Sequence, residues 1–389
     1  MASVAYFYPG RYNISMRMTR AIVHLDRLRR NIQAVRGHIG EGPLICMPIK
    51  ADAYGHGAIP LARAALSAGV RYLAVAALCE GAELREAGIR APILLLSIPG
   101  PEELPEAAAL DLIPLVTDRE LAGDIARAAA AAGKRLPVHL KVDTGMGRIG
   151  CPPGEAADLA AFIAAQPSLE YAGTATHLAV SDSPAAEDVR YTREQLARFG
   201  EALAAIRRAG LDPGIVHAAN SGAVVFHRDA WFDMVRPGIL LYGYPPDAGF
   251  PVLPLMELRS GVAFIKRVRP GESISYGRDW RADEETLIAT IPAGYGDGLP
   301  RGLGGKWSVY IRDRLYPLAG RICMDQCMVN LGRNSDIRRW EEVTIFGGPA
   351  PDAGAVASAM NTIPYEITVN ISKRVPRVYT KEPQDPAGC

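Results

Sequence analysis

The stretch LICMPIKADAYGHG, residues 44–57, indicates the fold more directly than any other part of the chain. Its first half is an apolar run of strand length, and its second half begins at Lys50 and contains the flexible residues Gly55 and Gly57. A strand that is apolar throughout is typical of a parallel sheet covered on both faces. A lysine at the end of such a strand could simply extend into solvent, or it could stand in an active site.

Seven further apolar runs follow before about residue 250. They are YLAVAAL (72–78), PILLLS (92–97), LIPLVT (112–117), PVHLKVD (137–143), YAGTATHL (171–178), IVHAAN (215–220) and VRPGILLYG (235–243). Between them lie Ala-, Glu- and Arg-rich stretches with apolar residues at helical spacing, such as DRELAGDIARAAAAAG (118–133). Eight strands joined by helices predict a parallel α/β fold, a (β/α)8 barrel over residues 19–252. An open doubly wound sheet is the alternative.

After about residue 252 helical stretches become scarce. Runs such as GVAFIKRV (261–268), ETLIATIP (285–292), KWSVYIR (306–312), CMVNL (327–331) and EEVTIFG (341–347) are separated by Gly, Pro and Asp. One helix is expected, in DAGAVASAMNTI (352–363). This pattern predicts a mostly β domain over residues 253–389. Residues 1–18 form an N-terminal extension that could pair with the β domain, or translation could begin at Met16 or Met18 instead of Met1.

The composition excludes several classes of protein. The formal net charge is +1, from 43 basic and 42 acidic residues, which gives no sign of a nucleic-acid or membrane-surface partner. No apolar run approaches the ~20 residues of a membrane helix. The first residues lack the continuous apolar core of a secretory signal, and six scattered cysteines form no disulfide-like pattern, so we expect a cytoplasmic protein.

Residues with side chains suited to catalysis or ligand binding lie where the predicted strands end. This is where (β/α)8 barrels carry their active sites. Lys50 follows the first strand. The fifth strand carries Lys141 and Asp143 and leads to Arg148, the sixth ends at His177, the seventh ends at Asn220 and Ser221, and the eighth holds Arg236 and Gly238. Each has an ordinary structural explanation alone, but their convergence on one rim indicates a site.

The loops after strands 7 and 8 of such barrels often bind phosphate through backbone N–H groups. A lysine amine together with a phosphate site suggests pyridoxal 5'-phosphate (PLP). The sequence contains no dinucleotide-binding or P-loop glycine motif and no GxSxG motif. It also contains no HExxH motif or other cluster of zinc ligands, so we expect no metal.

The chain resembles the bacterial alanine racemases over nearly its whole length. The motifs that carry the resemblance are IKADAYGHG (49–57), KVDTGMGRIG (141–150), THLAVSD (176–182), HAANSG (217–222), RPGILLYG (236–243), ISYG (274–277), GYGDGLPR (294–301), GRICMDQCMV (320–329) and PYEI (364–367). They occur in the family's order, and IKADAYGHG and RICMDQ are the most specific.

The resemblance implies a role for each matching residue on the cofactor side. Lys50 would bind PLP and act as one of two bases, and Arg236 would face the pyridine nitrogen with His177 supporting it. Arg148 would contact the phenolic oxygen of PLP, braced by Lys141, which matches a lysine that is often carbamylated. The cofactor-binding set would be completed by Tyr54, Asn220, Ser221, Gly238, Ile239 and Tyr365.

The resemblance also implies a homodimer with shared active sites. Tyr276 of the partner subunit would be the second base, and Met324 and Asp325 of the partner subunit would line the substrate carboxylate side. Tyr295 would narrow the entrance. The product, D-alanine, would supply peptidoglycan synthesis.

The expected chemistry follows from these residue types. Racemisation removes the α-proton on one face and returns a proton on the other, so two bases must flank the reacting carbon. An arginine is always charged and cannot protonate the ring nitrogen as a carboxylic acid would, so Arg236 should limit charge delocalisation and disfavour transamination. A phenol needs nearby positive charge to act as a base near neutrality, which His177 and the arginines could supply.

The chain departs from the usual family pattern at three positions, with Cys323 in place of a frequent serine, Gly296 in place of alanine and Leu299 in place of an aromatic residue. None replaces a catalytic group. Three alternatives stay open: a racemase for another amino acid such as serine or a basic one, a PLP-dependent decarboxylase of similar architecture, and a PLP-binding carrier without turnover.

Overall fold

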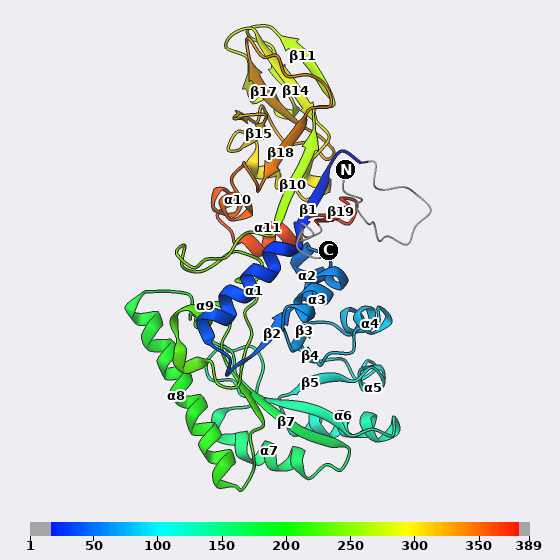
Figure 1. The fold of residues 1–389 in the computed structure, drawn as a ribbon, viewed down its shortest axis with the longest axis vertical. Helices are drawn as coiled ribbons and strands as arrows, with labels where there is room; N and C mark the ends of the chain where they lie inside the picture. Colours follow the sequence, from blue (N-terminus) through cyan, green and yellow to red (C-terminus); the bar gives the residue numbers. More distant parts are fainter. Residues whose placement is uncertain (1–16, 381–389) are drawn as a thin grey trace, which may run out of the picture. The chain divides into compact units, whose positions relative to one another are not determined.

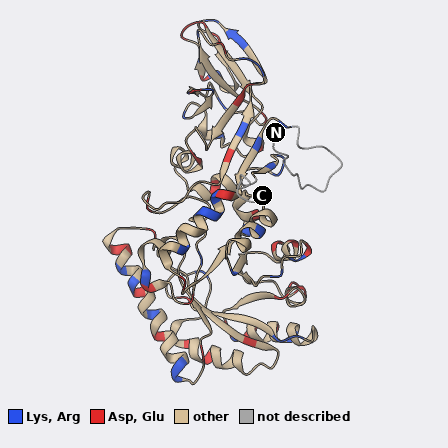
Figure 2. Cartoon of the chain, in the orientation of Figure 1, with Lys and Arg blue, Asp and Glu red and all other residues tan. Residues whose placement is uncertain are grey.

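The computed structural model describes residues 17–380, so the expectation for the N-terminal extension falls almost wholly outside the described residues. The described chain divides into two compact units. The barrel unit comprises Leu28–Ala53 and Ala58–Leu253, and the β unit comprises residues 17–27, 54–57 and 254–380. Lys and Arg are interspersed with Asp and Glu along the ribbon (Figure 2), which fits the near-zero net charge.

Eight parallel strands build the barrel unit, in the spatial order β8-β7-β6-β5-β4-β3-β2-β9. Figure 1 labels β2, β3, β4, β5 and β7 among them. The eight strands are β2 (Leu44–Pro48), β3 (Tyr72–Val75), β4 (Ile93–Leu95), β5 (Leu112–Val116), β6 (Leu136–Lys141), β7 (Leu169–Ala175), β8 (Ile215–His217) and β9 (Met234–Val235). Each overlaps one of the eight predicted runs. Apolar side chains of five neighbouring strands, Cys46, Ala74, Leu94, Ile113 and Met234, form one buried cluster.

The two end strands of this order, β8 and β9, are joined through Asp233 and not by a regular ladder. The Asp233 N–H donates to the carbonyl of Val216 at 3.0 Å, and the Asp233 carboxylate accepts from the Val216 N–H at 2.8 Å. The Arg236 N–H then donates to the carbonyl of Ala219 at 2.8 Å. These bonds nearly close the sheet, which confirms the barrel and not the open sheet.

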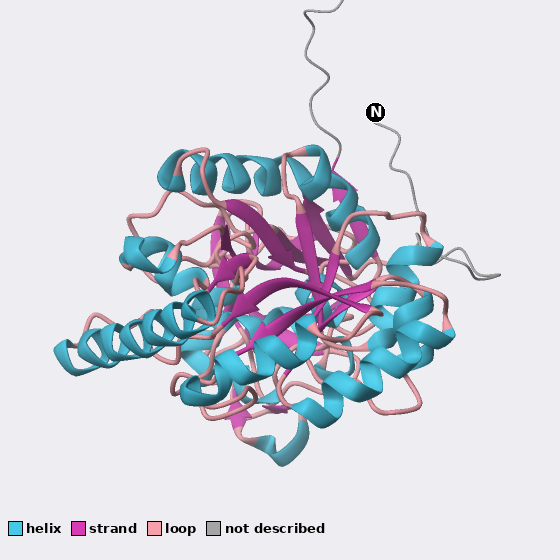
Figure 3. Ribbon diagram, turned by 90° about the horizontal axis from the view of Figure 1, so that it is seen from below, coloured by secondary structure: helices cyan, strands magenta, loops and turns pink. Residues whose placement is uncertain are grey.

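Helices surround the barrel strands, as the view in Figure 3 shows. They are α1 (Leu25–Ile39), α3 (Ala58–Ser67), α4 (Leu78–Glu86), α5 (Leu104–Ala109), α6 (Arg119–Ala131), α7 (Ala156–Ala164), α8 (Ala186–Arg208) and α9 (Ser221–Phe226), with one short turn, α2 (Lys50–Gly55). The predicted helix stretch 118–133 contains α6, which begins where the Asp118 side chain accepts from the Leu121 N–H. No helix within the described residues is long and apolar enough to span a membrane.

The β unit contains three sheets. The largest has the order β16-β15-β18-β10-β1-β19, the second β11-β14-β17, and the third is the hairpin β12-β13. The strands are β1 (Arg20–His24), β10 (Met256–Gly261), β11 (Phe264–Val268), β12 (Ser273–Ile274), β13 (Trp280–Arg281), β14 (Thr286–Ile291), β15 (Ser308–Ile311), β16 (Arg314–Pro317), β17 (Cys327–Gly332), β18 (Glu342–Phe346) and β19 (Arg377–Thr380). The helices are α10 (Ala353–Met360) and α11 (Pro364–Val369).

The prediction of a mostly β second part is confirmed: β11, β14, β15, β18 and α10 lie within the predicted runs, and β17 extends one residue beyond its run. The sequence reasoning missed β1 and β19, which pair in parallel although more than 350 residues separate them. A periodicity argument detects local pattern and cannot find such a pairing.

A buried carboxylate, Glu257 on β10, anchors the large sheet of the β unit. It accepts from Arg259 at 2.6 and 3.0 Å, from Arg27 at 3.0 Å and pairs with His24 at 2.9 Å, and only 2% of its side chain is exposed. Burial disfavours the ionised carboxylate, but the hydrogen bonds from His24 and Arg259 outweigh it and lower the pKa of Glu257 to about 2.

We expect Glu257→Gln to lower the free energy of unfolding of the β unit by about 3 kcal/mol at pH 7, because it removes one member of a buried charge network. Since the pKa of Glu257 is lower in the folded state, its contribution to stability is fully present at pH values above the ordinary pKa of a carboxyl group. This contribution is lost as pH falls toward about 2. Urea titrations at several pH values check this. Glu285→Gln, which breaks the exposed pair with Arg267, is the matched control, and an equal loss in both variants would contradict the assignment.

Candidate active site

A left-handed turn follows Lys50, which lies just after β2. Ala51, Asp52 and Ala53 have φ of 52° and Tyr54 has φ of 51°, so four consecutive residues with side chains adopt a conformation that favours glycine. At about 1–2 kcal/mol per residue the strain is on the order of 4–8 kcal/mol. The Asp52 carboxylate accepts from the Ala58 N–H at 2.7 Å and helps to hold the turn. Backbone strain of this kind concentrates at functional sites.

The amine of Lys50 is half-buried among charged groups. Burial lowers the pKa of Lys50 below its ordinary value, and the positive charge of Arg148 lowers it further, whereas the Glu80 carboxylate raises it. A lysine whose pKa is lowered is neutral more often and is a better nucleophile and base.

Arg236, after β9, is buried and bonds to neutral partners. It donates to the carbonyls of Thr176 and Ala218 at 2.8 and 3.1 Å, to His217 Nδ1 at 2.6 Å and to His177 Nδ1 at 3.3 Å. Burial lowers the pKa of Arg236 to about 10, so it stays charged near neutrality. Within the described residues no carboxylate pairs with it.

The histidines around Arg236 are held neutral, so His177 does not supply the positive charge that the sequence analysis expected of it. Burial, together with the charge of Arg236, lowers the pKa of His177 to about 2 and that of His139 to about 3, and lowers the pKa of His217 well below its ordinary value. His217 Nε2 lies 2.7 Å from His139 Nδ1. Because Arg236 donates to His217 Nδ1, the proton of that ring is on Nε2 and is donated to His139. The arginine therefore fixes the tautomers of a buried histidine pair.

Lys141, at the end of β6, is almost completely buried. Burial and the charge of Arg236 lower the pKa of Lys141 to about 7, and the charge of Arg148 acts in the same direction. Asp143 accepts from the N–H groups of Gly145 and Gly147 at 3.0 and 3.1 Å; burial raises its pKa, but these hydrogen bonds outweigh burial and lower it overall. The loop that carries Arg148 is thus anchored at Asp143.

Two neighbouring turns in the barrel unit present backbone donors. The Leu240 N–H donates to Ser221 Oγ at 3.2 Å, which links the turn after β9 to the beginning of α9, where Asn220 Oδ1 accepts from the Ala223 N–H. Gly222, Gly238 and Ile239 are buried residues, and no acceptor is found for the N–H groups of Gly238 and Ile239 in the described part of the chain. Buried donors without partners are rare, so this arrangement favours a ligand acceptor.

The remaining predicted site residues lie in the β unit. The rings of Tyr54 and Tyr365 meet with centroids 5.1 Å apart. Tyr276, Met324 and Tyr295 are large side chains that stay 71%, 52% and 42% exposed. Exposed aromatic and apolar side chains of this size are typical of surfaces that contact a partner or ligand.

A second arginine arranges the loop that holds Met324 and Asp325. Arg374 donates to the buried carboxylate of Asp297 at 2.8 Å, to Asp325 at 2.8 Å and to the carbonyl of Met324 at 3.2 Å. The N–H groups of Tyr295 and Gly296 donate to the carbonyls of Cys323 and Met324 at 3.0 and 2.8 Å. Tyr295, Met324 and Asp325 are therefore brought together by one cluster.

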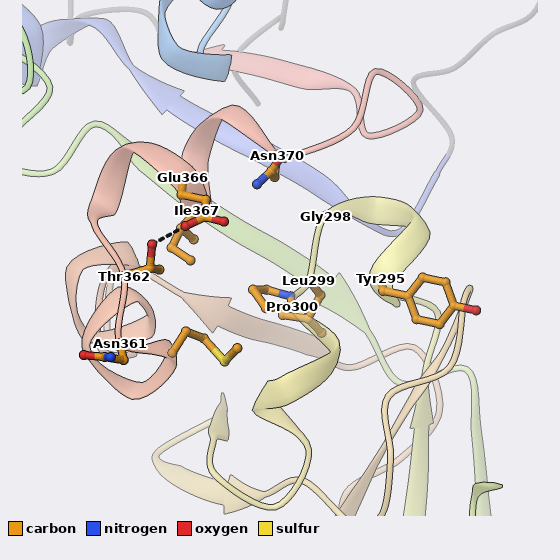
Figure 4. Close-up of a pocket in the computed structure, with 10 residues that line it drawn as sticks. Tyr295, Gly298, Leu299, Pro300, Asn361, Thr362, Glu366, Ile367 and Asn370 are labelled. Atoms are coloured by element: carbon orange, nitrogen blue, oxygen red, sulfur yellow. Dashed lines mark hydrogen bonds between the residues drawn. The ribbon is translucent and has the colours of Figure 1, made fainter.

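A pocket of about 480 Å³ lies beside this cluster, within the β unit (Figure 4). Its wall includes Met360, Asn361, Thr362, Glu366 and Asn370, and Glu366 accepts a hydrogen bond from the Thr362 hydroxyl. Tyr295 is the one predicted site residue in its lining, and its ring points away from the other labelled side chains (Figure 4).

The structure brings together, in the barrel unit, the predicted residues Lys50, Lys141, Arg148, His177 and Arg236, since the charges of the other four all act on His177. The sequence reasoning assigned no role to His217, His139, Glu80, Asp297 or Arg374. His217 stood within the quoted motif HAANSG, but a histidine in an apolar strand looks the same whether it contacts an arginine or merely packs.

The fold and these residues define a two-part enzyme with a (β/α)8 barrel, an amine-bearing site at its strand ends and a β unit. The family model for the alanine racemase N-terminal domain matches residues 23–246, and that for the C-terminal domain matches residues 255–379. The chain belongs to the alanine racemase family, whose members are isomerases.

Relatives and solved structures agree with this family. The alanine racemase of Treponema denticola is 48% identical over 377 residues, which cover 94% of this chain and 99% of that protein, and that of Treponema pallidum is 44% identical, with 94% and 100% covered. The structure of alanine racemase from Streptomyces lavendulae has a TM-score of 0.87 at 37% identity, covering 94% and 97%. That of Bacillus anthracis with bound L-Ala-P has a TM-score of 0.88 at 34% identity, covering 97% of each chain.

We expect Arg374→Ala to loosen the loop with Met324 and Asp325, because three hydrogen bonds from one guanidinium are lost. Amide hydrogen exchange in residues 294–297 and 323–326 should become about 5–30-fold faster, the factor for a local loss of ~1–2 kcal/mol. Arg339→Ala, which removes an exposed bond to the carbonyl of Ala263, should leave these segments unchanged. Equal exchange in wild type and Arg374→Ala would show that the arginine does not hold the loop.

Proposed function

We propose that this protein interconverts L-alanine and D-alanine with PLP held by Lys50. The observation that carries the proposal is the charged, carboxylate-free Arg236, which is bonded to neutral histidines in the same cluster as an amine of lowered pKa. The similarity to proteins named alanine racemase supports alanine as the substrate.

The residues of the barrel unit fit PLP in three respects. The Lys50 amine, with its lowered pKa, would bond to the cofactor carbonyl carbon. The N–H groups of Gly222, Gly238 and Ile239, together with Ser221, offer donors to a phosphate. Arg236 would lie at the pyridine nitrogen, with Asn220 completing the set and Arg148 at the phenolic oxygen.

PLP, when bound, stabilises negative charge at the α-carbon of an amino acid. Arg236 donates hydrogen bonds but keeps its protons, and the histidines that it contacts are neutral. No acid among these groups would protonate the ring nitrogen, so charge would stay closer to the α-carbon. The residues therefore favour return of the proton to that carbon over transamination.

The second base in this proposal is Tyr276 of the partner subunit of a homodimer. The 71% exposure of Tyr276 in one chain supports this, because an isolated tyrosine at the surface is free to enter a neighbouring site. In a two-fold dimer each chain would supply Tyr276, Met324 and Asp325 to the other, so that one contact completes two sites. Lys50 would serve one face of the substrate and Tyr276 the other.

The product D-alanine would feed peptidoglycan synthesis in the cytoplasm. Met324 would contact the substrate carboxylate side, and Tyr295 would narrow the entrance, which favours a small side chain. A racemase of broader specificity, with serine as a second substrate, would use the same catalytic residues. A PLP carrier without turnover would not need Tyr276.

The test is to mix the PLP-loaded protein with a panel of L-amino acids and follow the D-enantiomer. We expect conversion of L-alanine to an equal mixture, and much slower conversion of serine and lysine. Tyr276→Phe should keep the bound PLP and its colour but lower kcat by a factor of about 10²–10⁴, the usual contribution of a general acid or base. Bound PLP without racemisation of any amino acid would favour the carrier, and full activity of Tyr276→Phe would refute its role.

We further propose that Lys141 is carbamylated and that the carbamate accepts from Arg148. Carbon dioxide reacts with neutral amines, and the pKa of Lys141 of about 7 leaves about half of this buried amine neutral at pH 7. With ¹³C-labelled bicarbonate, we expect a carbamate NMR signal from wild type and none from Lys141→Gln. Lys134→Gln, at a half-buried lysine that pairs with Asp111, should keep the signal. A wild-type spectrum without it would contradict the assignment.

A further inference from the structure

Glu80 lies in the first turn of α4, and its carboxylate accepts three backbone hydrogen bonds. Oε2 accepts from the N–H groups of Ala76 and Ala77 at 2.7 and 3.1 Å, where β3 runs into the helix. The bond to Ala77 is the common reciprocal bond of a glutamate at the third helical position. Oε1 accepts from the N–H of Ala51 at 2.6 Å, although Ala51 is 29 residues away in the sequence.

The third bond is not explained by capping of α4. Ala51 directly follows Lys50 and is the first residue of the left-handed turn. Its N–H has no other acceptor in the residues that the structure describes. A left-handed turn of side-chain-bearing residues persists only where its surroundings hold it. Glu80 supplies a charge-assisted bond at the point where the strain begins, next to the lysine.

The charge of Glu80 also acts on the Lys50 amine, since this carboxylate opposes the effects of burial and of Arg148. Burial, Arg148 and Glu80 therefore all affect the pKa of the Lys50 amine. One side chain therefore joins the beginning of α4, the end of β3 and the backbone beside Lys50.

We propose that Glu80 is a positioning residue for Lys50: its carboxylate ties the left-handed turn at Ala51 to the loop between β3 and α4, and so fixes where the Lys50 amine is presented. The inference rests on the proposed function only through the role of Lys50. Glu80 would touch neither substrate nor cofactor and would act on Lys50 through the backbone.

A purely structural role would be a helix cap and nothing more. Asp118 gives a matched comparison, because its carboxylate accepts from the Leu121 N–H at 2.8 Å and caps α6. Loss of a cap costs on the order of 1 kcal/mol whichever helix it caps. Both Glu80→Ala and Asp118→Ala should therefore lower Tm, and only the first should disturb Lys50.

The experiment compares full-length, PLP-loaded wild type, Glu80→Ala, Glu80→Gln and Asp118→Ala. The first measurement is the Kd for PLP. We expect Glu80→Ala to weaken PLP binding about tenfold, the effect of losing one charge-assisted hydrogen bond. Glu80→Gln keeps one acceptor oxygen and should lie between Glu80→Ala and wild type. Asp118→Ala should bind PLP like wild type.

The second measurement is the rate of racemisation of L- and D-alanine that carry deuterium at the α-carbon. Lys50 serves one face, so a displaced amine should raise the isotope effect for one enantiomer and leave the other nearly unchanged. A loss of folded protein would lower both rates without changing either isotope effect. This readout therefore separates positioning from stability.

Wild-type Kd and isotope effects in both Glu80 variants, or changes that Asp118→Ala reproduces, would overturn the proposal. Should Glu80→Ala fail to fold, Glu80→Gln decides, since its side chain has nearly the same shape. Should wild type racemise no amino acid, the proposed function fails, while the comparison of PLP affinities still decides the role of Glu80.

Discussion

The barrel unit keeps the guanidinium of Arg236 charged in its interior, and the chemistry of the site depends on how that charge is satisfied. A buried cation ordinarily needs a carboxylate, because the desolvation cost of an unpaired charge is several kcal/mol. Here carbonyl oxygens and ring nitrogens accept hydrogen bonds from it. A histidine nitrogen accepts only when it lacks a proton, so the low pKa values of His177 and His217 are the condition under which the arginine can be held.

The same cations lower the pKa values of the two lysine amines. Arg236 lowers the pKa of Lys141, and Arg148 lowers the pKa of both Lys141 and Lys50. A cluster of cations that repel one another is costly unless anions join it. A phosphate and a carboxylate, which PLP and an amino acid would bring, relieve this repulsion. The charges that lower the pKa of both amines thus also favour binding of the proposed cofactor and substrate.

Much of the fold could be predicted from the sequence because its signals are local. The eight apolar runs separated by helical stretches gave the barrel, and Lys50, Lys141, His177 and Arg236 could be placed at strand ends by counting. The left-handed turn could not be predicted, since residues 51–54 contain no glycine and their conformation depends on contacts made elsewhere. Glu80 and Arg374 were missed for the same reason. The role of such a charged residue can be recognised only when its hydrogen-bond partners, which are distant in the sequence, are known.

In the proposed function, the neutral surroundings of Arg236 also bear on why a second base would be needed. No acid beside Arg236 would protonate the ring nitrogen of bound PLP, so negative charge would stay closer to the α-carbon of the substrate, and a proton donor would be needed there. A lysine on one face can return a proton only to that face, which restores the starting enantiomer. Inversion requires a donor on the opposite face, and in the proposed function only a group outside the barrel of the same chain, Tyr276 of the partner subunit, provides one. In the proposed function, the arginine inside the barrel and the contribution of a partner subunit would therefore both serve the same proton transfer.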